Sequence, residues 1–298
     1  MIAWLALRSL RNRWVTAGLT VLSIALAVAL LLGVERIRQA SREGFAATVS
    51  GTDLVVGARA SPVHLLLYSV FHIGNATNNL RWDSYRAIAQ RPEVAWIIPL
   101  SLGDSHRGYR VLGTSPEYFT HYRFARDRRL EFTQGAAFAN AGQAVLGAEV
   151  AASLGYRSGE SIVIAHGEGD VSFSLHERHP FTISGVLART GTPVDRTVHV
   201  SLDGLEALHE ESAPGADPLT ALLHSGGEIS TPRTLSALLV GLHSRGSALA
   251  MQRWVNEFAG EPLTAVLPGV ALQEVWEITG AAERALFAVS ALVAVVGL

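Results

Sequence analysis

The chain of 298 residues contains no cysteine and no lysine, and all 24 of its basic residues are arginine. Without cysteine it has no disulfide, no thiol nucleophile and no thiolate metal site. Without lysine it cannot form a Schiff base or place the lysine of a Walker A loop on nucleotide phosphates. If the protein depends on ATP, another chain must supply the ATPase.

The chain also lacks a strong charge of either sign, with 24 basic and 26 acidic residues and a formal net charge of −2. Such a chain produces no field that attracts nucleic acid, and we expect no nucleic-acid partner. Its mean hydropathy of +0.26 is high for a soluble protein. A water-soluble domain averaged with membrane segments explains this value.

Two uncharged apolar runs flank a long, water-soluble stretch. The run from Val15 to Val34, as a helix at about 1.5 Å per residue, reaches roughly 30 Å, the thickness of a bilayer's hydrocarbon core. The run from Ala285 is uncharged to its last residue, Leu298. We expect one complete transmembrane helix, one extramembrane domain and the start of a second transmembrane helix, in a natural protein that continues past Leu298.

The flanks of the first run bear on its orientation. Three arginines precede the run and three follow it closely, so the count of basic residues alone does not decide. A short N-terminal tail with arginines usually stays in the cytoplasm, which places residues 35 to 284 outside it. A cleaved signal peptide is the alternative. The length of the run and the lack of a nearby small-x-small cleavage site favour an uncleaved anchor.

The hydrophobic pattern between the runs predicts an α+β domain in which two distant β-α-β stretches pack into one split βαβ layer. The first stretch has strands at Asp53–Gly57, Val94–Leu100 and Tyr109–Leu112 with a helix at Trp82–Gln90. The second has strands at Leu235–Leu242 and Leu263–Leu267 with a helix at Ser247–Phe258. The βαβ subdomain is therefore expected to comprise residues 43–114 and 201–270.

Residues 115–200 are predicted to form a β-rich subdomain inserted into that layer. Its expected elements are a helix at Ala148–Leu154 and strands at Ala144–Leu146, Ser161–Ile164, Val171–Leu175, Phe181–Leu187 and Thr197–Val200. A loop is expected over Glu210–Ser230. Residues 1–42 would hold the cytoplasmic prelude, the first transmembrane helix and a helical stalk, and residues 271–298 a second stalk and the start of the second transmembrane helix.

Several stretches resemble the MacB/FtsX/LolC-LolE class of ABC-transporter permeases. They are ALRSLRNRWVTAGLTVLSIALAVALLL (6–32), VLGAEVAASLGYRSGESIVI (145–164), FTISGVLARTGTPVDRTVHVSLDGLEAL (181–208) and LQEVWEITGAAERALFAVSALVAVVGL (272–298). Each motif alone is weak, and the evidence lies in their order and in the single span before a large domain.

The resemblance implies four spans per subunit, a homo- or heterodimer in contact with membrane lipid, and a cytoplasmic ABC ATPase on a separate chain. This chain would then be a non-catalytic permease subunit of the bacterial inner membrane with a periplasmic main domain and no cofactor of its own, ATP being bound by the partner. The family's mechanism is mechanotransmission, in which ATP-driven motion reaches the outer domain and moves or releases a substrate. A periplasmic or lipoprotein partner would fit this role.

Two alternatives remain at this point. The first is an FtsX-like regulator that activates an extracytoplasmic partner such as a cell-wall hydrolase. The second is a membrane-anchored sensor or binding protein without an ATPase. Two further spans and a cytoplasmic coupling loop in the full-length protein would separate the second alternative from the others.

Three segments are candidate sites. His176 and His179 flank an acid and an arginine, and imidazole with carboxylate suits zinc, although a solvated turn explains the same residues. The apolar segment HLLLYSVFHI (64–73) is either core or an exposed patch that contacts a partner or substrate. The residues of this contact would be His64, Leu66, Tyr68, Phe71 and His72. Thr190–Pro193 could be read as a phosphate loop, but a turn between strands accounts for it better.

Overall fold

The structure, a computed structural model, describes residues 13–48, 50–125, 127–166, 180–211 and 234–273, together with 280, 285, 288 and 289. The chain divides into two compact units. One comprises Met1–Glu43 and Gln273–Leu298, and the other Gly44–Leu272.

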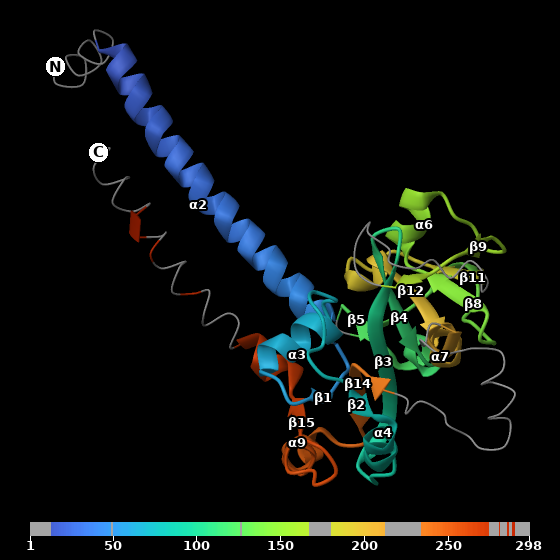
Figure 1. Cartoon of the computed structure of the whole chain (residues 1–298). Coiled ribbons are helices and arrows are strands. Elements are labelled where there is room, and N and C mark those ends of the chain that lie inside the picture. Colours follow the sequence, from blue (N-terminus) through green and yellow to red (C-terminus); the bar gives the residue numbers. More distant parts are fainter. Residues whose placement is uncertain are drawn as a thin grey trace, which may run out of the picture. The chain divides into compact units, whose positions relative to one another are not determined.

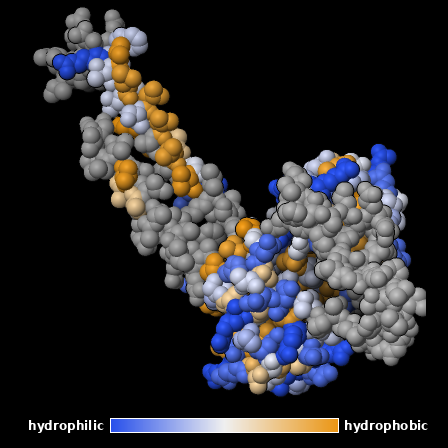
Figure 2. All heavy atoms as spheres, viewed as in Figure 1, coloured by the Kyte–Doolittle hydropathy of each residue, from blue (hydrophilic) through white to orange (hydrophobic). Residues whose placement is uncertain are grey.

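One long helix, α2 (Trp14–Thr48), contains the first apolar run (Figure 1). Its stretch Trp14–Arg36 has a mean hydropathy of 2.5 and is the one helix, among the residues that the structure describes, with the length and composition to cross a membrane. Large apolar side chains stand exposed along it, Leu26 at 68%, and Figure 2 shows them as an orange band. Side chains of this kind are stable in lipid. Helix α2 continues past the apolar stretch to Thr48, over the residues where the sequence predicts a helical stalk.

The unit Gly44–Leu272 is an α+β domain, as predicted, built on an 11-stranded sheet. The strands of the domain are β1 (Leu54–Ala58), β2 (Leu80–Arg81), β3 (Val94–His106), β4 (Tyr109–Thr114), β5 (Arg123–Phe124), β6 (Arg128–Arg129), β7 (Phe132–Gly135), β8 (Gln143–Leu146), β9 (Ser161–Ile162), β10 (Ala165–His166), β11 (Phe181–Leu187), β12 (Thr197–Ser201), β13 (Thr234–Leu235), β14 (Ala237–Leu242) and β15 (Leu263–Val266). Outside the large sheet, β13 pairs with β2 and β5 with β6. Its helices are α3 (Pro62–Ser69), α4 (Trp82–Ala89), α5 (Glu117–His121), α6 (Ala148–Leu154), α7 (Leu202–Glu211) and α9 (Ala248–Asn256), with short 3-10 helices η1 (Pro193–Arg196) and η2 (Arg245–Ser247).

The two β-α-β stretches interleave in the strand order β15-β1-β14-β3, which confirms the split βαβ layer. β1 and β14 pair antiparallel, with Val55 opposite Leu239 and Val56 opposite Leu238. Every residue of both strands is buried, so each reads as a continuous apolar run. Val55 and Leu239 share a core cluster with residues of α3 and α5, whereas Val56 and Leu238 share one with residues of α4 and α9.

The β-rich part continues the same sheet in the order β4-β12-β8-β11-β7. β4 and β12 pair in parallel from Arg110–Thr197 to Thr114–Ser201. β3 runs for 13 residues through an irregularity between Leu102 and Asp104, and its far end also pairs with β10. A single hydrogen-bonded sheet thus joins the two parts of the domain.

The structure differs from the predicted strands in two places. The strand expected at Leu235–Leu242 is divided at Ser236, whose N–H binds the Leu100 carbonyl at 2.8 Å and whose hydroxyl accepts from the Leu102 N–H at 3.0 Å. The strand expected at Ser161–Ile164 is replaced by the short strands β9 and β10. The predicted strand Val171–Leu175 and residues 212–233 of the predicted loop lie outside the described residues.

Candidate functional site at the end of helix α2

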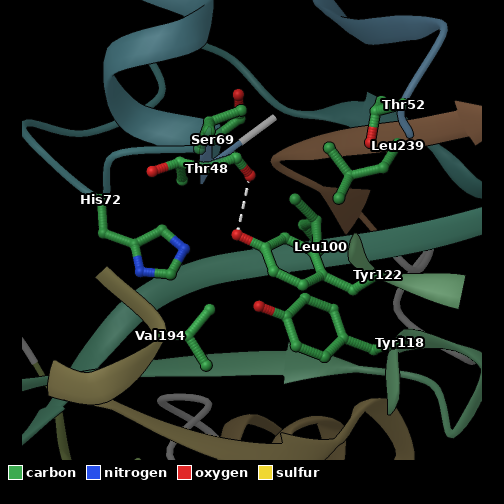
Figure 3. A pocket seen from close by; sticks show the side chains of 10 residues that line it. Thr48, Thr52, Ser69, His72, Leu100, Tyr118, Tyr122, Val194 and Leu239 are labelled. Carbon is green, nitrogen blue, oxygen red and sulfur yellow. Dashed lines mark hydrogen bonds between the residues drawn. The ribbon is translucent and has the colours of Figure 1, made fainter. Parts of the chain in front are cut away.

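Helix α2 ends at a residue that the domain core holds. Thr48 is 2% exposed, and its side-chain hydroxyl donates to the Gly44 carbonyl at 2.9 Å. The last carbonyls of a helix have no partner within the helix. The carbonyl of Thr48 instead accepts a hydrogen bond of 2.9 Å from the Tyr122 hydroxyl, drawn as the dashed line in Figure 3. One buried side chain thereby fixes the end of the helix.

A tight turn leads from this point into the sheet. Gly51 has a φ of +79°, and a Cβ atom there would lie 3.1 Å from the Arg123 side chain, so glycine suits both the turn and the space. Asp53 immediately precedes β1; its N–H binds the Val240 carbonyl, and its carboxylate accepts from the Leu242 N–H at 2.8 Å. The turn therefore leads from the end of α2 toward a strand that pairs on both sides, with β15 and β14.

Two tyrosines from α5 and its C-cap form the wall next to Thr48. Tyr118 and Tyr122, four residues apart, stack with ring centroids 4.9 Å apart and planes 20° apart. Tyr118 also packs against His199, at 5.1 Å. Burial raises the pKa of both phenols, so both hydroxyls are neutral and available as hydrogen-bond donors.

A cavity of about 10 Å³ lies among these groups, which is room for about one water molecule. Its walls come from the end of α2, the end of α3, β3, β14, α5 and η1. Figure 3 shows the lining residues, which are Thr48, Thr52, Ser69, Val70, His72, Leu100, Tyr118, Tyr122, Val194 and Leu239. The cavity thus marks the place where the βαβ part, the β-rich part and the end of α2 meet.

His72 connects the two parts of the domain across this point. Its Nδ1 lies 2.9 Å from the Thr197 hydroxyl, which itself donates to the Pro193 carbonyl at 2.9 Å. The single hydroxyl proton is therefore used, and His72 must carry its proton on Nδ1 and donate it. Burial, and then the nearby Arg110 charge, lower the pKa of His72 to about 4. The residue has a φ of 55°, an uncommon backbone conformation for a side chain of this size.

His199 on β12 lies fully buried beside this pair. Its Nδ1 is 3.3 Å from the Val145 carbonyl, and its Nε2 has no hydrogen-bond partner among the described residues. Burial is the main cause that lowers the pKa of His199 to about 3, and the His72 charge adds to it. Both imidazoles are neutral near pH 7. The site therefore holds stacked aromatic rings and hydrogen bonds between uncharged groups.

The predicted contact residues lie mostly in the core. Leu66, Tyr68 and Phe71 are between 1% and 8% exposed, so the exposed-patch interpretation is wrong for these three, and the core interpretation describes them. The reason is helical spacing, which turns these side chains of α3 and the residues after it toward the sheet. Burial raises the pKa of Tyr68 to about 12, and its hydroxyl binds the Ser236 carbonyl at 3.2 Å. His64 is half-buried against the Tyr68 ring.

Of the five predicted contact residues, only His72 lines the cavity. His176 and His179 lie outside the described residues, and their zinc site stays a prediction. Within the part of the chain that the structure describes, no group of three or more metal-ligating side chains is found. Sequence reasoning did not single out Tyr118, Tyr122, Thr197 or His199, and the spacing of the two tyrosines was the one signal available.

The Thr190–Pro193 segment is a turn, as predicted. The Asp195 carboxylate accepts hydrogen bonds from the Thr190 N–H at 2.7 Å, the Gly191 N–H at 2.8 Å and the Thr190 hydroxyl at 2.8 Å. A carboxylate of the chain itself thus occupies the donors that a phosphate would need.

A family model described as "MacB-like periplasmic core domain" matches residues 17–231. Among solved structures, the periplasmic region of MacB from Actinobacillus actinomycetemcomitans is similar at 10% identity and a TM-score of 0.46, over 78% of this chain and 97% of that chain. The extracellular domain of the noncanonic ABC-type transporter YknZ from Gram-positive bacteria is similar at 12% identity and a TM-score of 0.40, over 72% and 98%. No curated protein matches the sequence.

Proposed function

The chain belongs to the family of MacB-like periplasmic core domains, and on that premise we propose that it couples ATP hydrolysis by a separate ATPase to movement of its extracytoplasmic domain. The resemblance to MacB/FtsX-type permeases is thereby confirmed at the level of the family. The chain is a membrane protein with an extracytoplasmic domain. The family implies a partner ATPase and a dimer, and its permease components are generally non-catalytic.

The observation that carries the proposal is the continuity of α2. The same helix includes the candidate span Trp14–Arg36 and the buried residue Thr48. No glycine-rich linker separates the two. A continuous helix transmits displacement, whereas a flexible linker absorbs it.

The contacts at the end of the helix support the same mechanism. A shift of Thr48 acts on Tyr122 through their hydrogen bond, and on β1 through the short turn at Gly51. Tyr122 stacks on Tyr118, which packs against His199 of the β-rich part. A displacement of α2 would therefore move both parts of the outer domain as packed elements, a rigid-body or shear motion.

The test inserts a short Gly-Ser linker after Ser41, within α2 and beyond the candidate span. The matched control carries the same insertion after Thr77, in an exposed loop of the outer domain. Each variant is assembled with the partner ATPase and assayed for ATP hydrolysis and for rescue of a deletion strain.

We expect the Ser41 insertion to keep ATP hydrolysis and to lose rescue, while the Thr77 insertion keeps both. Full rescue by the Ser41 variant would contradict mechanotransmission. In the FtsX-like alternative the relay through α2 would be the same, and the quantity that is lost would be activation of an extracytoplasmic hydrolase.

A further inference from the structure

The two edge strands of the large sheet differ in whether side chains form hydrogen bonds to their outward-facing backbone groups. The sheet ends at β15 on one side and at β7 on the other. An edge strand presents backbone N–H and C=O groups that another chain can pair with, and proteins usually cover or block them. Only one of these two edges is blocked by side chains in the described part of the chain.

The β15 edge is closed by two side chains from α9. The Asn256 side-chain oxygen accepts from the Ala265 N–H at 2.7 Å, and the Gln252 side-chain amide donates to the Ala265 carbonyl at 3.0 Å. The two residues are one helical turn apart, so one helix face supplies both partners. Both polar groups of Ala265 are thereby removed from strand pairing.

Among the described residues, the β7 edge has no such cover. Thr133, Gln134 and Gly135 are exposed, and within the described residues no side chain forms a hydrogen bond to the backbone of Phe132–Gly135. On its inner side β7 pairs with β11, and the Thr133 hydroxyl adds a bond of 3.1 Å to the Val186 carbonyl. The strand is held by β11 on one side, and its other side pairs with no strand in the described part of the chain.

A groove of about 380 Å³, a size found among ligand sites, lies between α6 and the strands β7 and β11. Ala148, Ala151 and Ala152 of α6 form one wall, Thr133 and Gln134 of β7 line it, and Val186 of β11 contributes apolar surface. The Gln134 side chain accepts from the Ser158 N–H at 3.3 Å, so the loop after α6 is tied to the edge strand. The groove is therefore preformed.

The charged groups that line the groove are all positive. They are the guanidinium groups of Arg157 and Arg189, both exposed, and neither forms an ion pair within the described part of the chain. The nearby Glu160 binds the backbone N–H of Arg157 instead of its guanidinium. A third guanidinium, from Arg107, lies 5.9 Å from the ring centre of Tyr156, another lining residue. Carboxylates are the complement of such groups.

We propose that the groove beside β7 binds an extended, acidic segment of a partner protein, which joins the sheet as an additional strand. The β7 backbone would supply the ladder hydrogen bonds, and Arg157 and Arg189 would pair with carboxylates on the segment. This partner site is separate from the contacts of α2 and does not depend on the proposed relay.

The test measures binding of a short fluorescent peptide that alternates valine with glutamate to the full chain in lipid nanodiscs, by fluorescence anisotropy. Two comparison peptides separate the contributions. One replaces glutamate with lysine, and the other keeps glutamate but carries N-methyl groups that prevent strand pairing. The variant Arg157→Glu/Arg189→Glu reverses the groove charge, and Arg86→Glu/Arg253→Glu makes the same change in net charge at exposed sites on α4 and α9.

We expect saturable binding of the acidic peptide, about tenfold or more weaker in the groove variant and unchanged in the control variant. The lysine peptide and the N-methyl peptide should bind the wild-type chain weakly. Their affinities should be no higher than the affinity of the acidic peptide for the groove variant. The proposal is overturned by absent binding, by equal binding of the N-methyl peptide, or by an equal loss in the control variant. Unchanged thermal unfolding of both variants shows that any loss comes from the groove and not from misfolding.

Discussion

The Tyr122 hydroxyl donates to the carbonyl of Thr48 at 2.9 Å, so a side chain from the C-cap of α5 holds the last residue of α2. The bond is buried, and it joins the helix to the stacked pair of Tyr122 and Tyr118. A helix end that is fixed in this way has a defined position relative to the strand that follows it.

Removing this hydrogen bond should lower the stability of the domain and loosen its connection to the end of α2. We expect Tyr122→Phe to lower the free energy of unfolding by about 1 kcal/mol or more, since a buried carbonyl loses its partner. Tyr118→Phe is the matched control, because it keeps the stack and, in the described part of the chain, removes no hydrogen bond. Denaturant unfolding of the two variants checks the difference, and equal stability would contradict the role given to the Thr48 contact.

The two buried histidines make stability depend on pH. Their folded pKa values, about 4 for His72 and about 3 for His199, lie below the ordinary value of 6.5. Below pH 6.5 the unfolded chain binds protons that the folded chain does not. The stabilisation is therefore complete above pH 6.5 and is lost as the pH falls toward 4 and then 3.

His199→Leu should flatten this dependence. Between pH 7 and pH 5 we expect its free energy of unfolding to fall by about 2 kcal/mol less than that of the wild type. His243→Leu is the control, because His243 is exposed in the folded chain. An unchanged pH profile in the His199 variant would show that this imidazole is already protonated in the folded state.

Asp195 should be essential to the turn before β12. Its carboxylate is 4% exposed and accepts three hydrogen bonds, and Asp195→Ala would leave the Thr190 and Gly191 N–H groups without it. We expect a loss of about 2–3 kcal/mol in unfolding free energy. Asp127→Ala, which removes an 89% exposed side chain from a surface ion pair, should cost less than about 1 kcal/mol. A thermal shift as small for the first variant as for the second would refute the assignment.

A substitution at Leu238 tests whether β14 is a buried strand of the split βαβ layer. It is fully buried in β14, and Leu238→Asp should lower unfolding free energy by about 3–5 kcal/mol or prevent folding, because the charge has no partner there. The same change at Leu249, which is 69% exposed on α9, should shift stability by about 0.5 kcal/mol at most. Circular dichroism melts of both variants provide the comparison.

The side chains of Gln252 and Asn256, which block the β15 edge, should prevent self-association of the protein. The double variant Gln252→Ala/Asn256→Ala frees both polar groups of Ala265, and we expect it to associate at concentrations where the wild type does not. Light scattering of matched samples measures this. Arg253→Ala, between the two residues on the same helix, is the control.

The split βαβ layer was predictable because its strands are covered on both faces and are therefore apolar throughout, as at Leu54–Val56 and Ala237–Leu242. Helices α4, α6 and α9 were predictable from spacing and from stop signals such as Arg91-Pro92. α3, α5 and α7 were not predicted as helices. Of these, α5 has only five residues, too few turns to show a period. The cavity was not predictable either, because its residues come from six elements and only the tertiary fold brings them together.

The five-residue parallel ladder between β4 and β12 joins the two parts of the domain, and it therefore bears on which feature of the domain a partner protein can recognise. Because that ladder ties the βαβ part to the β-rich part, the proposed relay would move the domain without changing its internal shape. On the proposed mechanism, an antibody against a folded epitope that spans both parts would bind equally well in every nucleotide state, while a distance label between two copies would report the change. A protein that responds to this domain would then respond to its location, and the surface that it recognises could stay constant.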